Sequence, residues 1–282
     1  MKTPLCTVDG VQLPKDERMT ERDDTFDNGL GDDAVPPFVL VAPNGARRGP
    51  ADHSEVPVTV EQIVATAQDC HHAGAHGLHL HVRDNRGKHS LDAGRYLETL
   101  AELQRVVPRM VVQITTEAAG VFDVDAQIQC LRDVTPNWAS ISVREIARQP
   151  ELAPRVYALC EDQGTRVQHI LYDADDAALL AHWRDEGIVA PSQNERLLVL
   201  GRYRDNQQSS PSDLDRFPMD VSPWMVCAFG SQEHVCLHEA ARRGADVRVG
   251  FENSLIGPDG QNWSDNAASV AALVARIGRK PE

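Results

Sequence analysis

From Pro37 onward the sequence alternates eight times between a short apolar run and a longer polar or helix-like segment. Such runs, rich in Val, Ile and Leu, are typical of parallel strands whose two faces are both covered. The pattern therefore predicts a parallel sheet with helical crossovers. The predicted strands are Phe38–Ala42, Gly77–Val82, Met110–Thr115, Trp138–Val143, Arg166–Tyr172, Arg196–Leu200, Trp224–Phe229 and Asp246–Phe251.

Most of the segments between these strands have the apolar spacing of amphipathic helices. The first begins with the capping-box pair Thr59 and Gln62 and ends before Gly74. The segment Tyr203–Pro218 is polar and predicts only weak helix. The predicted helices are Thr59–Ala73, Asp92–Val107, Val124–Asp133, Glu151–Gln163, Asp175–Glu186, Ser231–Arg243 and Ser264–Ile277.

The number and spacing of these units select between two α/β folds. Eight units over 282 − 37 = 245 residues match a (β/α)8 barrel, which typically takes ~250 residues. A doubly wound open sheet would instead want a glycine-rich G-x-G-x-x-G turn after the first strand, and Pro43–Ala46 does not supply one. We therefore predict a barrel domain over residues 37–282.

Residues 1–36 differ from the rest of the chain. They hold nine acidic and four basic residues and show no apolar periodicity, so we predict a flexible acidic arm that ends at Pro36 and Pro37.

The composition excludes several classes of function. The chain has 28 Lys+Arg against 42 Asp+Glu, a formal charge of −14, which disfavours nucleic-acid binding. No run approaches the ~18 apolar residues of a membrane helix, and the polar N-terminus does not resemble a secretory signal. The six cysteines form no C-x-x-C pair, so we expect reduced thiols in the cytoplasm.

The most informative motif is the His79-Leu80-His81 run on the second predicted strand. Side chains alternate along a strand, so both imidazoles point to one face, and inward-facing groups at carboxyl ends of barrel strands form active sites. Two imidazoles so placed can bind one divalent metal. The competing interpretation is two core or surface histidines that are satisfied by hydrogen bonds.

The eighth predicted strand adds a carboxylate and a cation. Arg248 and Glu252 share a face by the period of two, and closure of the barrel brings this strand beside the first, which pairs with the second. Two histidines and Glu252 leave an open position on a catalytic zinc, although such a set also suits Fe²⁺. Zinc would polarise a ketone and Arg248 would bind a carboxylate. The alternatives are a loop or capping role for Glu252 and a structural ion pair for Arg248.

Other strand ends carry groups that could contact a substrate. The candidates are Thr115 and Thr116 after the third strand, Ser140 and Ser142 on the fourth, and Arg47 and Arg48 after the first. Hydroxyls there can also serve as helix caps, and a basic loop can simply be solvated. We find no motif for nucleophilic catalysis, and Cys227 is expected in the core.

Four segments together resemble a known family. They are Val56–Ile63 (VPVTVEQI), Ala73–Asp84 (AGAHGLHLHVRD), Val111–Thr116 (VVQITT) and Val247–Asn253 (VRVGFEN). Their order and content are similar to the β-keto acid cleavage enzymes, the family of 3-keto-5-aminohexanoate cleavage enzyme. The resemblance extends from Phe38 to about Arg279.

The resemblance implies a TIM barrel with one zinc on His79, His81 and Glu252. It implies exchange of acyl groups between a β-keto acid and acetyl-CoA, giving acetoacetate and a new acyl-CoA. Arg248 would act at the substrate carboxylate, and Thr115 and Ser140 would supply hydroxyls. It also implies a homo-oligomer, a tetramer or dimer.

Some positions depart from the family pattern. Asn253 replaces an aspartate thought to take part in proton transfer, and an amide cannot act as a base. Arg47 replaces an acidic residue that pairs with a substrate ammonium, which favours an anionic or polar tail. Glu117-Ala118 replaces a glycine pair, and Ser142 stands where asparagine is common. We keep Asn253 among the catalytic candidates, and Arg47, Ser140, Ser142 and Thr116 among the substrate-binding ones.

Two other readings compete with an active cleavage enzyme. One is a degenerate barrel that binds zinc and a keto acid without turnover, indicated by Asn253, Arg47 and Glu117. The other is a metal-dependent hydrolase of the amidohydrolase kind. That kind typically carries H-x-H on the first strand, further histidines on the fifth and sixth, and an aspartate on the eighth. Here the motif falls on the second strand, the sixth has no histidine, and the eighth carries Glu252.

Overall fold

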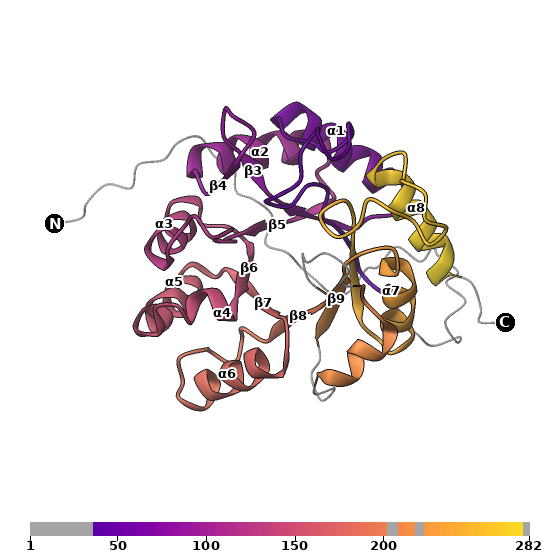
Figure 1. Cartoon of the computed structure of the whole chain (residues 1–282). Coiled ribbons are helices and arrows are strands. Elements are labelled where there is room, and N and C mark those ends of the chain that lie inside the picture. Colours follow the sequence, from indigo (N-terminus) through magenta and orange to yellow (C-terminus); the bar gives the residue numbers. More distant parts are fainter. Residues whose placement is uncertain (1–35, 202–207, 218–222, 279–282) are drawn as a thin grey trace.

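The structure, a computed structural model, describes residues 36–201, 208–217 and 223–278. Residues 1–35 of the predicted arm (1–36) lie outside this part, as do residues 203–207 and 218 of the segment predicted to be weakly helical, Tyr203–Pro218. Eight parallel strands form a closed barrel in the order β1-β10-β9-β8-β7-β6-β5-β2, and the helices form a ring around it (Figure 1). The predicted (β/α)8 barrel is confirmed.

The strands of the barrel match the predicted apolar runs within a few residues. Their bounds are Val39–Val41 (β1), Gly77–Leu80 (β2), Val111–Thr115 (β5), Trp138–Ser142 (β6), Arg166–Leu171 (β7), Glu195–Leu200 (β8), Trp224–Ala228 (β9) and Asp246–Val249 (β10). The strand β1 pairs with both β10 and β2, so the barrel closes where the sequence predicted.

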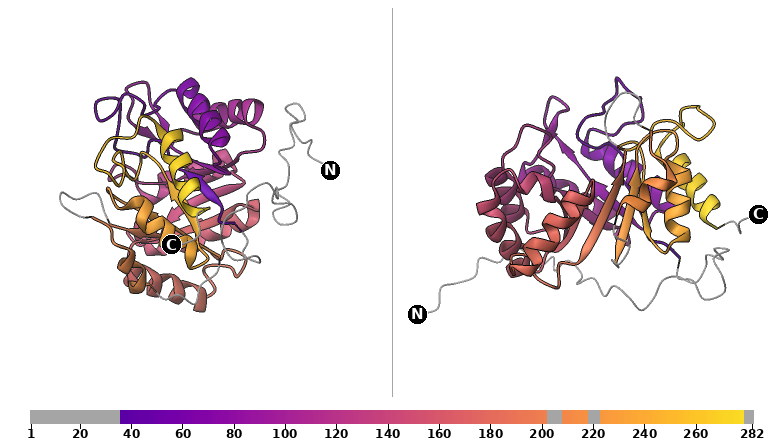
Figure 2. Two further views of the ribbon diagram at one scale, coloured as in Figure 1. Left: turned by 90° about the vertical axis from the view of Figure 1, so that its right-hand side faces the viewer. Right: turned by 60° about the horizontal axis from the view of Figure 1, so that its bottom comes forward.

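The helices lie between the strands and cover the outside of the barrel (Figure 2). The predicted capping box is present, since Thr59 caps the first helix and Gln62 reciprocates. The helices are Val60–His72 (α1), Ala93–Val106 (α2), Val124–Val134 (α3), Val143–Ile146 (α4), Ala153–Gln163 (α5), Ala174–Asp185 (α6), Glu233–Arg242 (α7) and Asn266–Ile277 (α8). Two 3₁₀ turns, Pro150–Leu152 and Pro211–Arg216, precede α5 and β9. No helix in the described ranges is long and apolar enough to cross a membrane.

Two apolar clusters follow from the alternation of side chains along the strands. The outer cluster joins residues such as Leu78, Leu80 and Val82, which alternate with His79 and His81, to the helices. The inner cluster fills the barrel and includes Leu197 and Met225. The five cysteines within the described part, Cys227 among them, are buried and free, as predicted for reduced thiols.

Two features were not predicted. A hairpin of Val82–Arg83 (β3) and His89–Ser90 (β4) follows β2 and stands outside the barrel sheet. The short helix α4 begins directly after β6, where the apolar run Trp138–Val143 had suggested strand to its end. Both features lie at the carboxyl ends of the strands, where the polar residues collect.

Candidate metal centre

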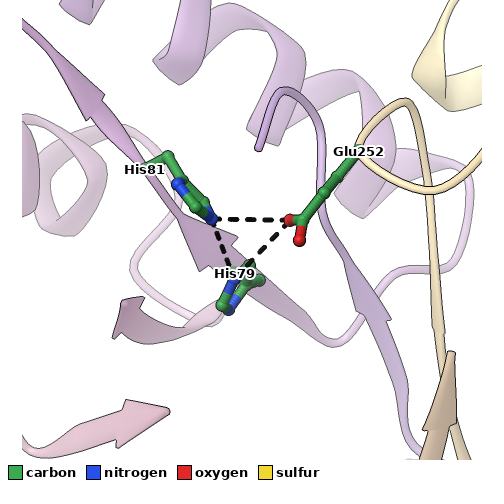
Figure 3. A group of neighbouring side chains, drawn as sticks. All are labelled: His79, His81 and Glu252. Carbon is green, nitrogen blue, oxygen red and sulfur yellow. Dashed lines mark hydrogen bonds and ion pairs between the residues drawn. The ribbon is translucent and has the colours of Figure 1, made fainter. Parts of the chain in front are cut away.

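His79, His81 and Glu252 form one buried cluster above β1. His79 lies on β2 and His81 follows the last residue of that strand, while Glu252 follows β10. Figure 3 shows the two imidazoles side by side with the carboxylate opposite them. The Nε2 atoms of His79 and His81 are 3.1 Å apart, and Oε2 of Glu252 lies 3.6 Å and 3.5 Å from them, respectively.

Glu252 reaches the cluster through a turn and not through the strand. The prediction that Arg248 and Glu252 share a strand face was wrong, because β10 ends at Val249. Gly250 has φ +136° and lies so close to β1 that a Cβ would come within 2.6 Å of the Ala42 carbonyl oxygen. Only glycine fits this approach. At Gly45 (φ +60°) a Cβ would lie 2.5 Å from Cγ of Glu252, so this glycine leaves room for the Glu252 side chain.

Burial and neighbouring charges set the ionisation of the cluster. Burial and, to a smaller extent, the nearby Arg248 guanidinium lower the pKa of His79 to about 3. Burial alone would raise the pKa of Glu252, but Arg248, His79 and His81 together hold it well below its usual value. A neutral imidazole and an ionised carboxylate are the forms that bind a metal ion.

The three side chains fit a divalent cation. All three ligand atoms lie within 4.8 Å of one another, and within the described residues this is the group of His, Cys, Asp and Glu side chains that meets that condition. Two nitrogens on one tetrahedral zinc lie about 3.3 Å apart, close to the 3.1 Å between the two Nε2 atoms. Two histidines and one carboxylate also leave room for a substrate oxygen.

Arg248 lies next to the cluster, as predicted. Its Nη2 donates to Oε1 of Glu252 at 3.1 Å and lies 3.4 Å from Sγ of Cys227. Arg248 is 3% exposed and lies on β10. It therefore places a positive charge beside the His79, His81 and Glu252 cluster.

The hydroxyl groups predicted to contact a substrate differ in their hydrogen-bond partners. Ser140 and Ser142 lie on β6, and their buried Oγ atoms have no hydrogen-bond partner within the described part of the chain. Thr115 Oγ1 accepts from the Glu117 amide at 3.0 Å, which leaves its hydrogen to be donated. Thr116 instead donates to the Ser140 carbonyl at 3.1 Å, so its hydroxyl also holds β5 against β6.

The two arginines after β1 have different surroundings. Arg48 donates to the carbonyls of Phe251 and Asn253 and so holds the turn after β10. The Arg47 side chain is 54% exposed, and its Nη2 lies 3.9 Å from Oε1 of Glu117. Asn253 is completely buried beside Glu252, with its carbonyl held by Gly230 and its amide side-chain atoms unpaired within the described residues.

Sequence reasoning missed two residues around the cluster, Gln113 and His89, and assigned no role in the cluster to a third, Glu117. Gln113 on β5 lies 2.7 Å from Nδ1 of His79, and His89 on the β3–β4 hairpin lies 3.4 Å from Nδ1 of His81. Glu117 was noted as a departure from the family pattern and as one indication of a degenerate barrel, and its Oε2 lies 3.9 Å from Nε2 of His81. Burial raises the pKa of Glu117. A glutamine inside the apolar run Val111–Thr115 was the one available signal for Gln113.

A family model described as β-keto acid cleavage enzyme matches residues 36–281. The chain belongs to this family of keto acid-cleaving enzymes. A 3-keto-5-aminohexanoate cleavage enzyme of Acetoanaerobium sticklandii is 32% identical, over 84% of this chain and 90% of that protein. A 3,5-dioxohexanoate:acetyl-CoA acetone transferase of Paraburkholderia graminis is 24% identical, over 84% of this chain and 88% of that protein.

Solved structures with the same barrel include ObcA in complex with oxaloacetate. That structure has a TM-score of 0.53 and 17% identity, and the match covers 78% of this chain. The chain spans 63% of ObcA, less than two thirds of its length. At this identity the likeness concerns the fold alone. Membership of the cleavage-enzyme family was the expectation raised by the sequence motifs, and the family model confirms it.

Proposed function

We propose that the protein is a zinc-dependent β-keto acid cleavage enzyme that uses acetyl-CoA as co-substrate. A β-keto acid, R–CO–CH₂–COO⁻, would react with acetyl-CoA to give acetoacetate and R–CO–SCoA. The R–CO group moves to the thiol sulfur, and the acetyl group moves to the carbon that R–CO leaves. The observation that carries the proposal is the buried cluster of His79, His81 and Glu252 beside Arg248.

Each residue has a proposed role that follows from its chemistry. His79, His81 and Glu252 would hold zinc, which supplies Lewis-acid polarisation of the ketone. Arg248 would bind the substrate carboxylate through its planar fork. The unpaired hydroxyls of Ser140 and Ser142, with Thr115, would donate to substrate oxygens, and Thr116 would complete that wall of the site.

Arg47 would determine the preferred substrate tail. Its exposed guanidinium stands where the β1 loop faces Glu117, so an anionic or polar group R could accept hydrogen bonds from it. A cationic tail would be repelled by Arg47. We further propose a cytoplasmic homo-oligomer, a dimer or tetramer, in keeping with the free buried cysteines and the family resemblance.

Metal content and turnover test this proposal together. We expect about one zinc per chain in the purified protein by elemental analysis, and its loss in Glu252→Gln and His79→Ala. His72→Ala removes an imidazole from the exposed face of α1 and should keep the metal. The same wild-type protein should release acetoacetate from acetyl-CoA with at least one member of a panel of β-keto acids. Absence of zinc after refolding with the metal contradicts the proposal.

Asn253 favours one alternative, a barrel that binds zinc and a keto acid but no longer turns over. Its amide cannot accept a proton as a carboxylate would. Keto acid binding without acetoacetate release, followed by a gain of rate in Asn253→Asp, supports that alternative. Turnover by the wild type that is unchanged or lower in Asn253→Asp contradicts it.

A further inference from the structure

A chain of amide hydrogen bonds leads away from His79 to a sulfur atom. Nδ1 of His79 lies 2.7 Å from Oε1 of Gln113, whose Nε2 donates to Oε1 of Gln168 at 3.0 Å. Nε2 of Gln168 in turn faces Sδ of Met225 at 3.7 Å. All four side chains belong to barrel strands, and the two glutamines are buried.

The sulfur fixes the direction of every hydrogen bond in this chain. A thioether has lone pairs and no hydrogen, so the group that faces Met225 is the NH₂ of Gln168. Gln168 therefore turns its oxygen to Gln113, and Gln113 turns its own oxygen to His79. Nδ1 of His79 must then carry the hydrogen, which leaves the lone pair of the neutral ring on Nε2.

A second chain leads from His81 to a backbone carbonyl. Nδ1 of His81 lies 3.4 Å from Nδ1 of His89, and Nε2 of His89 lies 2.8 Å from the Glu117 carbonyl oxygen. A carbonyl only accepts, so Nε2 of His89 carries a hydrogen. A neutral imidazole carries one hydrogen, and on His89 that hydrogen is on Nε2, so Nδ1 of His89 accepts from His81. The lone pair of His81 is thus also on Nε2.

Two separate chains therefore give the same result at both histidines. We propose that Gln113 and His89 are positioning residues, which hold both imidazoles as Nδ1–H tautomers so that two Nε2 lone pairs face Glu252. This inference rests on the proposed metal site, but not on the proposed substrate. Groups that orient metal-binding histidines in this way typically change metal affinity 10–100-fold when removed.

The tautomers can be observed directly in the metal-free protein. Nitrogen-15 NMR of the full chain, labelled at histidine and treated with a chelator, distinguishes Nδ1–H from Nε2–H rings. Signals of His79 and His81 are assigned by their loss in His79→Gln and His81→Gln. We expect both rings as Nδ1–H tautomers at neutral pH. An Nε2–H ring at either position overturns the inference.

Zinc affinity, measured by competition with a coloured chelator, gives the second test. We expect Gln113→Met and His89→Phe to weaken zinc binding about 10–100-fold, because phenylalanine accepts no hydrogen bond from imidazole and a thioether accepts only a weak one. Gln113→Glu should stay near the wild-type affinity, since a carboxylate still accepts and Gln168 can turn its amide to meet it. If Gln113 only filled space, the zinc affinities would have the reverse order. Gln113→Met would then bind zinc more tightly than Gln113→Glu, because methionine is better tolerated in an apolar barrel.

A control and the possible failures separate this inference from the proposed function. His72→Phe, on the exposed face of α1, should leave the zinc affinity unchanged. Affinities within twofold of wild type in both Gln113→Met and His89→Phe overturn the inference. If the wild type binds no zinc, the proposed function fails, and the NMR tautomers alone then decide whether Gln113 and His89 orient the rings.

Discussion

Opposite sides of the barrel interior are buried to the same degree but carry different chemistry. Strands β8 and β9 supply Leu197 and Met225, which are 0% and 3% exposed, whereas β2 and β5 supply His79 and Gln113, which are 1% and 0% exposed. The strand order places β8 and β9 across the barrel from β5 and β2.

Equal burial has opposite energetic consequences on the two sides. Apolar area removed from water stabilises the fold by ~25 cal/mol per Å². A buried imidazole, amide or carboxylate loses hydration and recovers it only through hydrogen bonds or a bound ion. The β2–β5 side therefore costs stability that the β8–β9 side does not. We infer that the polar side is maintained for binding and chemistry.

The largest expected effect comes from making the polar side apolar at Arg248. In Arg248→Met we expect kcat/KM to fall about 10²–10³-fold, because the substrate carboxylate loses its charged partner. Zinc content should persist, since His79, His81 and Glu252 remain. Steady-state kinetics with the best keto acid of the panel, beside elemental analysis, checks both parts.

A second arginine provides the control for Arg248. Arg166 is the first residue of β7. Its Nε donates a hydrogen bond to Oε1 of Glu195 at 2.9 Å, and its Cζ lies 4.6 Å from the centroid of the Trp138 ring, away from the cluster. Arg166→Met should reduce stability and leave kcat/KM within about threefold of wild type. Equal losses of kcat/KM in the two variants would show that Arg248 acts through the fold alone.

The next effect compares the two sides through stability. Leu197→Ala should lower the free energy of unfolding by about 2–5 kcal/mol, because it leaves a cavity in the apolar side. Thr115→Val keeps the side chain's shape but removes the acceptor of the Glu117 amide, so it should lower that free energy by about 1–3 kcal/mol while reducing kcat/KM. Urea unfolding and kinetics on both variants measure these values. The comparison breaks down if Thr115→Val is the more destabilising change.

The sequence allowed the principal site to be predicted because two rules of geometry combine. Alternation along β2 places His79 and His81 together, and barrel closure brings the end of β10 to β2 across β1. Glu252 was correctly predicted to lie beside the two histidines, but the prediction wrongly assumed that the strand continues to Glu252. Its position depends on a turn at Gly250, where the chain approaches β1, and alternation contains no information about that turn.

The surrounding residues could not be predicted for physical reasons. His89 lies on a hairpin whose strands have two residues each, too short to leave a periodic pattern. Its contact with His81 depends on how that hairpin folds over the barrel, which only the tertiary structure determines. Gln113 was visible as a polar residue in an apolar strand, but its orientation depends on Gln168 and Met225, from other strands.

The smallest predicted effect concerns Glu145, a carboxyl behind the polar side. Its Oε2 accepts from the Ala118 amide at 2.9 Å and from Gln127 at 3.0 Å, and burial raises its pKa from 4.5 to about 7. Between these two values the folded protein keeps a proton that the unfolded chain has released. The free energy of unfolding therefore falls as the pH rises through that window, by an amount on the order of 2 kcal/mol that is due to Glu145.

Glu145→Gln removes this titration, so the variant should gain stability relative to wild type between pH 5 and pH 8. Any hydrogen bond lost in the variant contributes equally at both pH values and cancels in the difference. Urea unfolding at the two pH values measures it, with Glu151→Gln, an exposed carboxyl, as the control. If the difference in free energy of unfolding between Glu145→Gln and wild type is the same at both pH values, this buried carboxyl does not destabilise the fold at neutral pH. The energetic contrast between the two sides would then rest on the cluster itself.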